Sequence, residues 1–80
     1  MKVYIVTEIY FSEDGVHKEI KCVCKDENTA RDKMKEYAKK QLEEQFEYEN
    51  WAITTIEDDE CILDSMYESL VFKINEWEVI

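Results

Sequence analysis

The chain has 80 residues, 45% of them hydrophobic and 38% charged, and its 20 acidic against 10 basic side chains give a formal net charge of −10. This length allows one domain, residues 1–80, with a modest core. The negative charge disfavours direct binding to nucleic acid or to an anionic membrane, and it makes a basic protein the natural partner. Residues 1–11 have neither a signal-peptide cleavage pattern nor membrane-spanning length, so we expect a cytoplasmic protein.

Side chains alternate along the first two segments of the chain, which predicts two paired antiparallel strands. From Lys2 to Phe11, β-branched and aromatic residues dominate, with apolar side chains on both faces. Gly15, the only glycine, can supply the left-handed backbone position of the short turn that follows. The alternation resumes from Val16 to Lys25. One face of this second strand is expected to hold its apolar and thiol side chains: Val16, Ile20, Cys22 and Cys24.

The apolar period changes to three or four residues in the next segment, residues 25–50, which predicts an amphipathic helix. Its apolar positions are Ala30, Met34, Tyr37 or Ala38, Leu42 and Phe46. Asp26 or Asn28 can cap the start of this helix, and Glu27 lies where a negative charge favours the helix dipole. The exposed side mixes acids and bases four residues apart, as is typical of a solvated helix.

Two more strands are expected in the second half of the chain, from Trp51 to Ile56 and from Leu70 to Ile80. In the last strand, the apolar residues change from one face to the other partway along. A bulge near Asn75 or Glu76 would return both sets to the core.

The segment between these two strands, residues 58–69, shows a different spacing. It places Cys61, Ser65 and Ser69 four residues apart, which favours a short second helix over a long hairpin loop. The predicted fold is therefore α+β: an antiparallel four-stranded sheet in ββαββ order, with one main amphipathic helix packed on one face and a short second helix.

The first half of the chain resembles a group of phage proteins. The strand KVYIVTEIY and the stretch CVCKDENTARDKMKEYAKKQL, in which a strand leads directly into a charged helix, are similar to many short uncharacterised proteins of phages, prophages and their bacterial hosts. The resemblance implies a phage or mobile-element setting, in which small acidic proteins often inhibit host defence or host enzymes. It carries over no functional residues.

The negative charge belongs to the second half of the chain. Residues 1–42 hold eight acids and nine bases, a net charge of +1, whereas residues 43–80 hold twelve acids and one base, a net charge of −11. Two groups of carboxylates stand out: Glu44, Glu47 and Glu49 near the end of the predicted helix, and the consecutive Glu57, Asp58, Asp59 and Glu60.

Carboxylates held close together on a rigid scaffold can present rows of negative charge to a site built for phosphate. Tyr48, Tyr67 and Trp77 are the aromatic candidates for anchoring contacts. On this hypothesis the protein is an inhibitor of the anti-CRISPR or anti-restriction type, which occludes a basic nucleic-acid-binding site by mimicking nucleic acid. The alternative is a module that acts by homodimerisation or through a sheet edge such as residues 76–80, with the acids serving solubility.

The candidate metal ligands and nucleophiles do not form a recognisable site. One residue separates Cys22 from Cys24, whereas zinc knuckles separate their cysteines by two to four residues, and His17 is expected on the opposite strand face. The acidic run 57–60 lacks the alternating ligands, the glycine and the distal Glu of an EF-hand loop. The serines have no identifiable catalytic base. We therefore expect no metal, no cofactor and no enzymatic activity.

Overall fold

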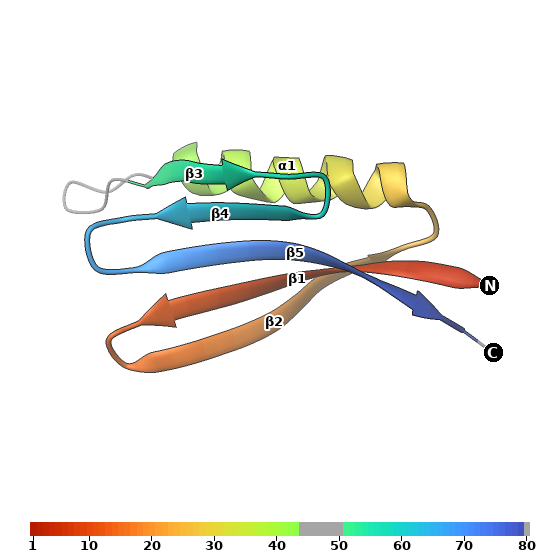
Figure 1. Ribbon diagram of the computed structural model, residues 1–80, viewed down its shortest axis with the longest axis horizontal. Helices are drawn as coiled ribbons and strands as arrows, with labels where there is room; N and C mark the ends of the chain where they lie inside the picture. Colours follow the sequence, from red (N-terminus) through yellow and green to blue (C-terminus); the bar gives the residue numbers. More distant parts are fainter. Residues whose placement is uncertain (44–50, 80) are drawn as a thin grey trace.

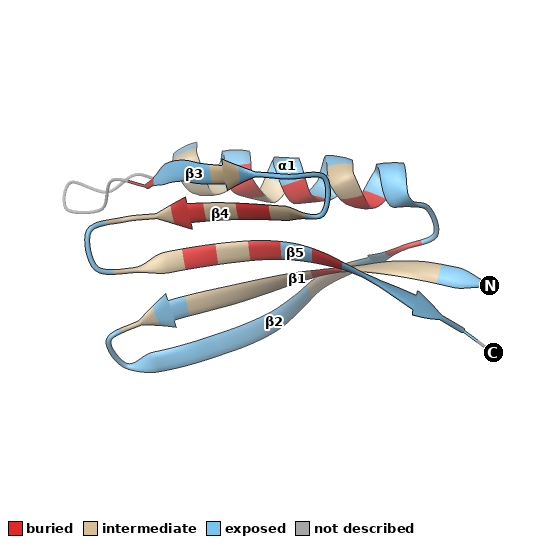
Figure 2. Ribbon diagram, viewed as in Figure 1, coloured by how far each residue is buried: buried red, intermediate tan, exposed pale blue. Residues whose placement is uncertain are grey.

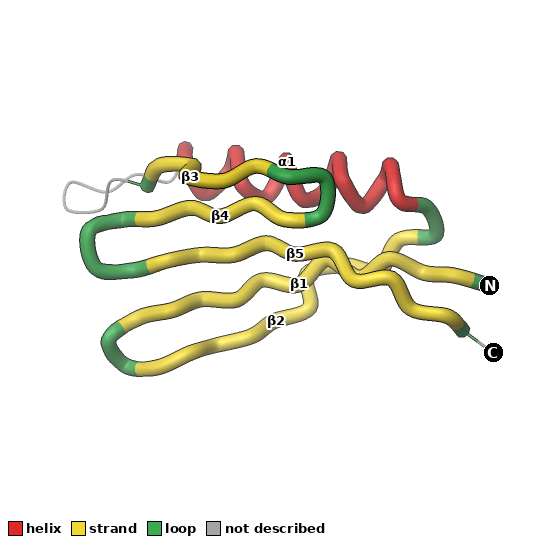
Figure 3. Tube along the Cα trace, in the orientation of Figure 1, coloured by secondary structure: helices red, strands yellow, loops and turns green. Residues whose placement is uncertain are grey.

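The computed structural model describes residues 1–43 and 51–79, and it has two layers: a five-stranded antiparallel sheet and one helix across one of its faces (Figure 1). In chain order the elements are β1 (Lys2–Ser12), β2 (Gly15–Cys24), α1 (Glu27–Glu43), β3 (Ala52–Ile56), β4 (Glu60–Asp64) and β5 (Ser69–Glu78). The strand order is β2-β1-β5-β4-β3, so the last strand lies at the centre, between two hairpins (Figure 3). In the part of the chain that the structure describes, no helix has the length and apolar character needed to cross a membrane.

The α+β class, the first hairpin and the main helix are confirmed, but the four-stranded sheet and the short second helix are wrong. Residues 58–69 form part of one turn, then β4, then a second turn. β4 pairs with β3 on one side and with β5 on the other, as at Cys61, which lies between Ile56 and Phe72. These backbone hydrogen bonds on both sides outweigh the four-residue spacing that favoured a helix. The outer strands of the sheet are therefore β2 and β3. Residues 76–78 of β5 pair with β1 alone, because the pairing with β4 ends at Lys73, so this part of β5 is an edge, as predicted.

The core lies between α1 and the middle of the sheet (Figure 2). We call the side of the sheet under α1 the helix face and the other side the open face. The helix contributes Ala30, Met34 and Ala38 to the core. The strands contribute the buried side chains of the helix face: Val6, Cys24, Cys61, Leu63, Leu70, Phe72 and Ile74. Trp51 is 4% exposed and completes this core just before β3.

A bulge in β2 changes the face on which its side chains lie. The pairing with β1 shifts between Val6 and Thr7, and Lys21 is the extra residue in β2. Because side chains alternate along a strand, the extra residue moves the rest of β2 to the other face. Val16 and Ile20 therefore point to the open face, whereas Cys22 and Cys24 point to the helix face. The prediction that one face holds all four apolar and thiol side chains is therefore wrong.

The central strand β5 pairs with β1 in one unbroken register. Phe72 therefore faces the helix, while Trp77 stays on the open face and is 60% exposed. The bulge predicted near Asn75 or Glu76, which would have returned Trp77 to the core, is wrong. Two hairpins hold β5 in register, one on each side, so its apolar residues are divided between the two faces.

Asp26 fixes the start of α1. Its two carboxylate oxygens accept hydrogen bonds from the backbone N–H of Thr29, at 2.8 Å, and from the Thr29 hydroxyl, at 2.9 Å. These bonds favour the charged carboxylate and hold the pKa of Asp26 below its usual value. Asp26, rather than Asn28, is therefore the cap. The helix runs to Glu43, and the rest of the predicted helix lies outside the described residues.

We expect Phe72→Ala to lower the free energy of unfolding by ~3–5 kcal/mol, because it empties the centre of the core beneath the helix. Urea denaturation measures this loss. The matched control is Tyr67→Ala, which removes an aromatic ring that is 73% exposed in the turn after β4 and should change stability little. Equal losses in the two variants would contradict the position assigned to the core.

We expect Asp26→Ala to lower the thermal midpoint at neutral pH, while Asp26→Asn, which keeps a capping oxygen, lowers it less. Because the pKa of Asp26 is lowered in the folded protein, its stabilising effect is fully present above the pKa that this carboxyl has in the unfolded chain. The effect is lost as the pH falls through the pKa of Asp26 in the folded protein. The difference between wild type and Asp26→Ala should therefore shrink in acid. Thermal melts over a pH series measure it, and a difference that grows on acidification would contradict the cap.

Candidate functional site

The turn between β3 and β4 holds the acidic run 57–60 beside the start of α1 and the second half of β5. The backbone N–H of Glu57 donates to the carbonyl of Glu60 at 2.7 Å, which closes the turn. The N–H of Ile74 donates to the carbonyl of Asp59 at 2.8 Å, which ties the turn to the central strand. Three of these four acids are exposed and the fourth, Glu60, is half-buried. The carboxylates therefore project from a backbone that is hydrogen-bonded in place.

The fold adds carboxylates from two other segments to this end of the molecule. Glu27 is the first residue of α1, and Glu76 and Glu78 lie at the end of β5. Glu27, Asp59 and Glu76 share the lining of one hollow of about 240 Å³. We call this group the acidic end, and its carboxylates are those of Glu27, Glu57, Asp58, Asp59, Glu60, Glu76 and Glu78. Three of them, Glu27, Glu76 and Glu78, were not predicted as site residues, because they lie far from the acidic run in the chain.

Three basic side chains lie among these carboxylates: Lys2, Arg31 and Lys73. Arg31 bonds to Glu27 within α1, and its Nη2 lies 3.9 Å from Oδ2 of Asp58. Lys2 Nζ lies 2.8 Å from Oε1 of Glu76, and this hydrogen bond raises the pKa of Lys2. Seven carboxylates and three bases leave an excess of negative charge at this end. The ion pairs orient the carboxylates that take part in them.

The structure does not bring the other predicted site residues to the acidic end. Glu44, Glu47, Tyr48 and Glu49 lie outside the described residues. The described helix ends at Glu43, at the far end of α1 from the acidic run (Figure 1). Tyr67 is exposed in the turn after β4, also at the far end of that strand. An exposed aromatic side chain that does lie at the acidic end is Trp77, between two of its glutamates.

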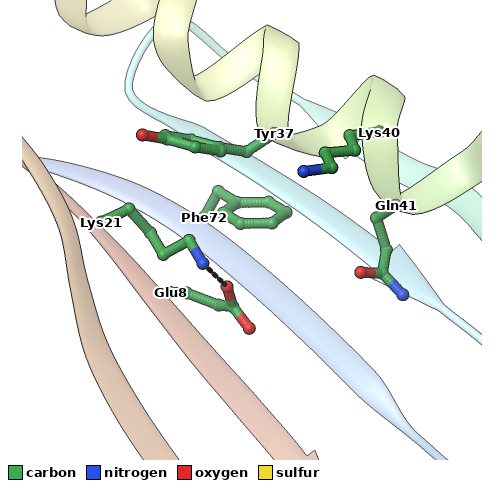
Figure 4. A pocket seen from close by; sticks show the side chains of 6 residues that line it. All are labelled: Glu8, Lys21, Tyr37, Lys40, Gln41 and Phe72. Atoms are coloured by element: carbon green, nitrogen blue, oxygen red, sulfur yellow. Dashed lines mark ion pairs between the residues drawn. The ribbon is translucent and has the colours of Figure 1, made fainter. Parts of the chain in front are cut away.

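A second hollow, of about 260 Å³, opens between α1 and the β1–β2 side of the sheet (Figure 4). Its lining residues are Glu8, Lys21, Tyr37, Lys40, Gln41 and Phe72. Lys21 Nζ lies 3.1 Å from Oε2 of Glu8 and 5.6 Å from the centre of the Tyr37 ring, which in turn stacks on Phe72. Burial alone would lower the pKa of Lys21, but the hydrogen bond and attraction of Glu8 raise it. Because Glu8 already balances the ammonium charge, we interpret this pair as closing the gap between helix and sheet.

The thiols of Cys22 and Cys24 lie beside this hollow, with their Sγ atoms 3.7 Å apart. His17, expected on the opposite strand face, lies on the same face because of the bulge at Lys21, but it pairs with Tyr10 near the hairpin turn. Within residues 1–43 and 51–79, no three His, Cys, Asp or Glu side chains are arranged to hold a metal ion.

No protein-family model matches this chain, and neither a curated protein nor a solved structure matches it. The function must therefore be inferred from the charges, burial and contacts of the described residues. By these criteria the acidic end is the best candidate site, because three separate segments place like charges together there.

We expect the Tyr37 phenol to ionise at a higher pH than a free tyrosine. Hydrogen bonding to Cys22, together with burial, raises the pKa of Tyr37 to about 12. The neutral phenol therefore stabilises the fold at pH values below ~10, the pKa of tyrosine in the unfolded chain. This contribution is lost as the pH rises through the pKa of Tyr37 in the folded protein. Carbon chemical shifts of the Tyr37 ring, followed by NMR over an alkaline titration, measure this pKa. Cys22→Ala should lower it, and an unchanged pKa in that variant would contradict the Cys22 contact.

Proposed function

We propose that this protein is a non-catalytic inhibitor that binds a basic protein partner through its acidic end and blocks the partner's nucleic-acid-binding site. The observation that supports this proposal is the convergence of carboxylates from α1, the β3–β4 turn and β5 on one end of the molecule. Carboxylates grouped in this way attract a basic cleft from a distance and accelerate association. Occupation of the cleft then excludes nucleic acid without any chemical step.

The carboxylates of the acidic end are closely spaced. Glu57, Asp58, Asp59 and Glu60 are consecutive, and Glu76 and Glu78 lie on one face of β5 two residues, ~6.8 Å, apart. Duplex DNA likewise presents closely spaced negative charge, one per ~1.7 Å of axis, to the proteins that bind it. Backbone hydrogen bonds at Glu57 and Asp59 hold the turn, so little conformational entropy is lost when a partner binds.

An exposed aromatic side chain accompanies the charge. Trp77 projects from the open face at the acidic end and is 60% exposed. Tryptophan is enriched among the residues that contribute most to protein–protein affinity. Charge would thus guide the encounter, while Trp77 would supply apolar contact area.

The resemblance to phage and prophage proteins supplies a biological setting for the proposal. A phage-encoded protein of this kind would act in the cytoplasm of the host cell. Its target would be a defence protein or another protein that processes DNA or RNA, as for inhibitors of the anti-CRISPR or anti-restriction type. Such targets carry the basic clefts that a phosphate-like surface fits.

The test compares two variants that remove four charges each. The first changes the acidic run to Glu57→Gln, Asp58→Asn, Asp59→Asn and Glu60→Gln. The control removes four exposed acids elsewhere, by Glu13→Gln, Asp14→Asn, Asp32→Asn and Glu43→Gln. Immobilised wild type should capture from bacterial lysate a nucleic-acid-binding protein that elutes at moderate salt and that duplex DNA displaces. The first variant should bind that protein about tenfold more weakly or worse, while the control binds it nearly as well as wild type.

Circular dichroism and thermal melts should show that both variants keep the fold, because the mutated side chains are exposed or half-buried. Equal binding by wild type and the first variant would contradict the proposal. Equal loss in both variants would also contradict it, since net charge rather than the acidic end would then govern binding.

A further inference from the structure

The open face of the sheet carries a largely apolar surface that no described element covers. Strand pairing places these side chains on one face: Val3, Ile5, Ile9, Phe11, Val16, Ile20, Val23, Ile62, Val71 and Trp77. Ile20 is 63% exposed and Val23 is 59% exposed, and Figure 2 shows β2 exposed along most of its length. Single exposed apolar residues are ordinary, but a contiguous apolar sheet face usually marks a contact surface.

We propose that the open face is the interface of a homodimer, in which the sheets of two copies pack against each other as in a β-sandwich. The size of the face fits this arrangement. The molecule measures 45 by 23 Å across its two longer axes, so covering the face would bury on the order of 800 Å² per copy. A standard stable interface buries about that area on each partner.

The charges on the open face favour a second copy as the occupant. The face carries two basic residues, Lys18 and Lys73, and two acidic residues, Glu60 and Asp64. It is therefore neutral on a protein whose formal net charge is −10. A neutral face is where two strongly acidic copies can approach each other with least repulsion.

The positions of these charges also select the symmetry of the dimer. Lys18 lies on the edge strand β2, in a row that runs through Ile9 and Val71 to Ile62 on β4. A two-fold axis parallel to the strands, between β1 and β5, places β2 of one copy over β4 of the other. Lys18 of one copy then lies over Ile62 of the other copy, between the acidic side chains of Glu60 and Asp64. A two-fold axis perpendicular to the strands would instead stack β4 of one copy on β4 of the other and place their acidic side chains opposite one another.

This symmetry leaves the acidic ends of both copies at the same end of the dimer. The dimer would thus present two acidic ends side by side. The binding of a partner to both ends rests on the proposed function, whereas the dimer itself does not. A partner with two basic sites, or one long basic cleft, would then gain from simultaneous contact with both copies.

Sedimentation of the purified protein without any partner tests the dimer directly. Wild type should sediment as a dimer at micromolar concentration, in low and in high salt, because apolar contacts hold it. Ile20→Glu, on the open face, should weaken dimerisation about tenfold or more, because it would bury an added charge opposite Glu60 of the other copy. The matched control is Ile56→Glu, since Ile56 is 62% exposed but lies on the helix face, and it should leave the dimer intact. A monomeric wild type, or a dimer that survives Ile20→Glu, would overturn the inference.

A charge exchange tests the symmetry. Lys18→Glu and Glu60→Lys should each weaken the homodimer, because each places like charges opposite one another. An equimolar mixture should recover a heterodimer, which mass spectrometry of the intact complex distinguishes from either homodimer. No recovery in the mixture would exclude the strand-parallel axis. Since the partner of the proposed inhibitor is absent, dimerisation can succeed or fail independently of partner capture.

Discussion

One helix covers one face of a sheet that is wider than the helix, and this mismatch of width shapes the rest of the molecule. An α-helix with its side chains is ~10 Å across, whereas five strands spaced ~4.8 Å apart span about twice that width. Only side chains under the helix axis, such as Phe72 and Leu63, are fully buried. Hollows remain along both sides of α1, one lined by Tyr37 and Lys21 and the other by Ile53 and Ile56. The opposite face of the sheet has no second helix among the described residues.

The fold presents two surfaces of different physical character, one charged and one apolar. The acidic end lies where strand ends, a turn and the start of α1 meet, and its charge acts over a distance set by ionic strength. The open face is apolar and neutral, so contact there depends on shape and on exclusion of water. Trp77 belongs to both surfaces, because it projects from the open face beside Glu76 and Glu78. Under the proposed function and the proposed dimer, Trp77 would therefore couple binding at the two surfaces.

The helix and the first hairpin, which depend on local periodicity and a short turn, were predictable from the sequence, whereas β4 and the strand registers were not. The helix and its Asp26 cap follow from a spacing of three to four residues and from a short-range hydrogen bond. β4 has five residues, and its alternation is too short to outweigh the competing spacing of Cys61 and Ser65. The bulge at Lys21 follows from the register with β1, where Lys21 meets Glu8. Likewise the acidic run was visible, but the contributions of Glu27 and Glu76 depend on tertiary structure.

The central position of β5 has a consequence for how the chain folds as it is synthesised. The β1–β2 and β3–β4 hairpins form from neighbouring segments, but only β5 joins them, and it follows both in the chain. Until β5 is synthesised, the two hairpins lack the strand that joins them into one sheet. Folding therefore waits for the contacts between β1 and β5, which are far apart in the sequence, and such contacts form slowly and prolong the exposure of apolar strands to chaperones.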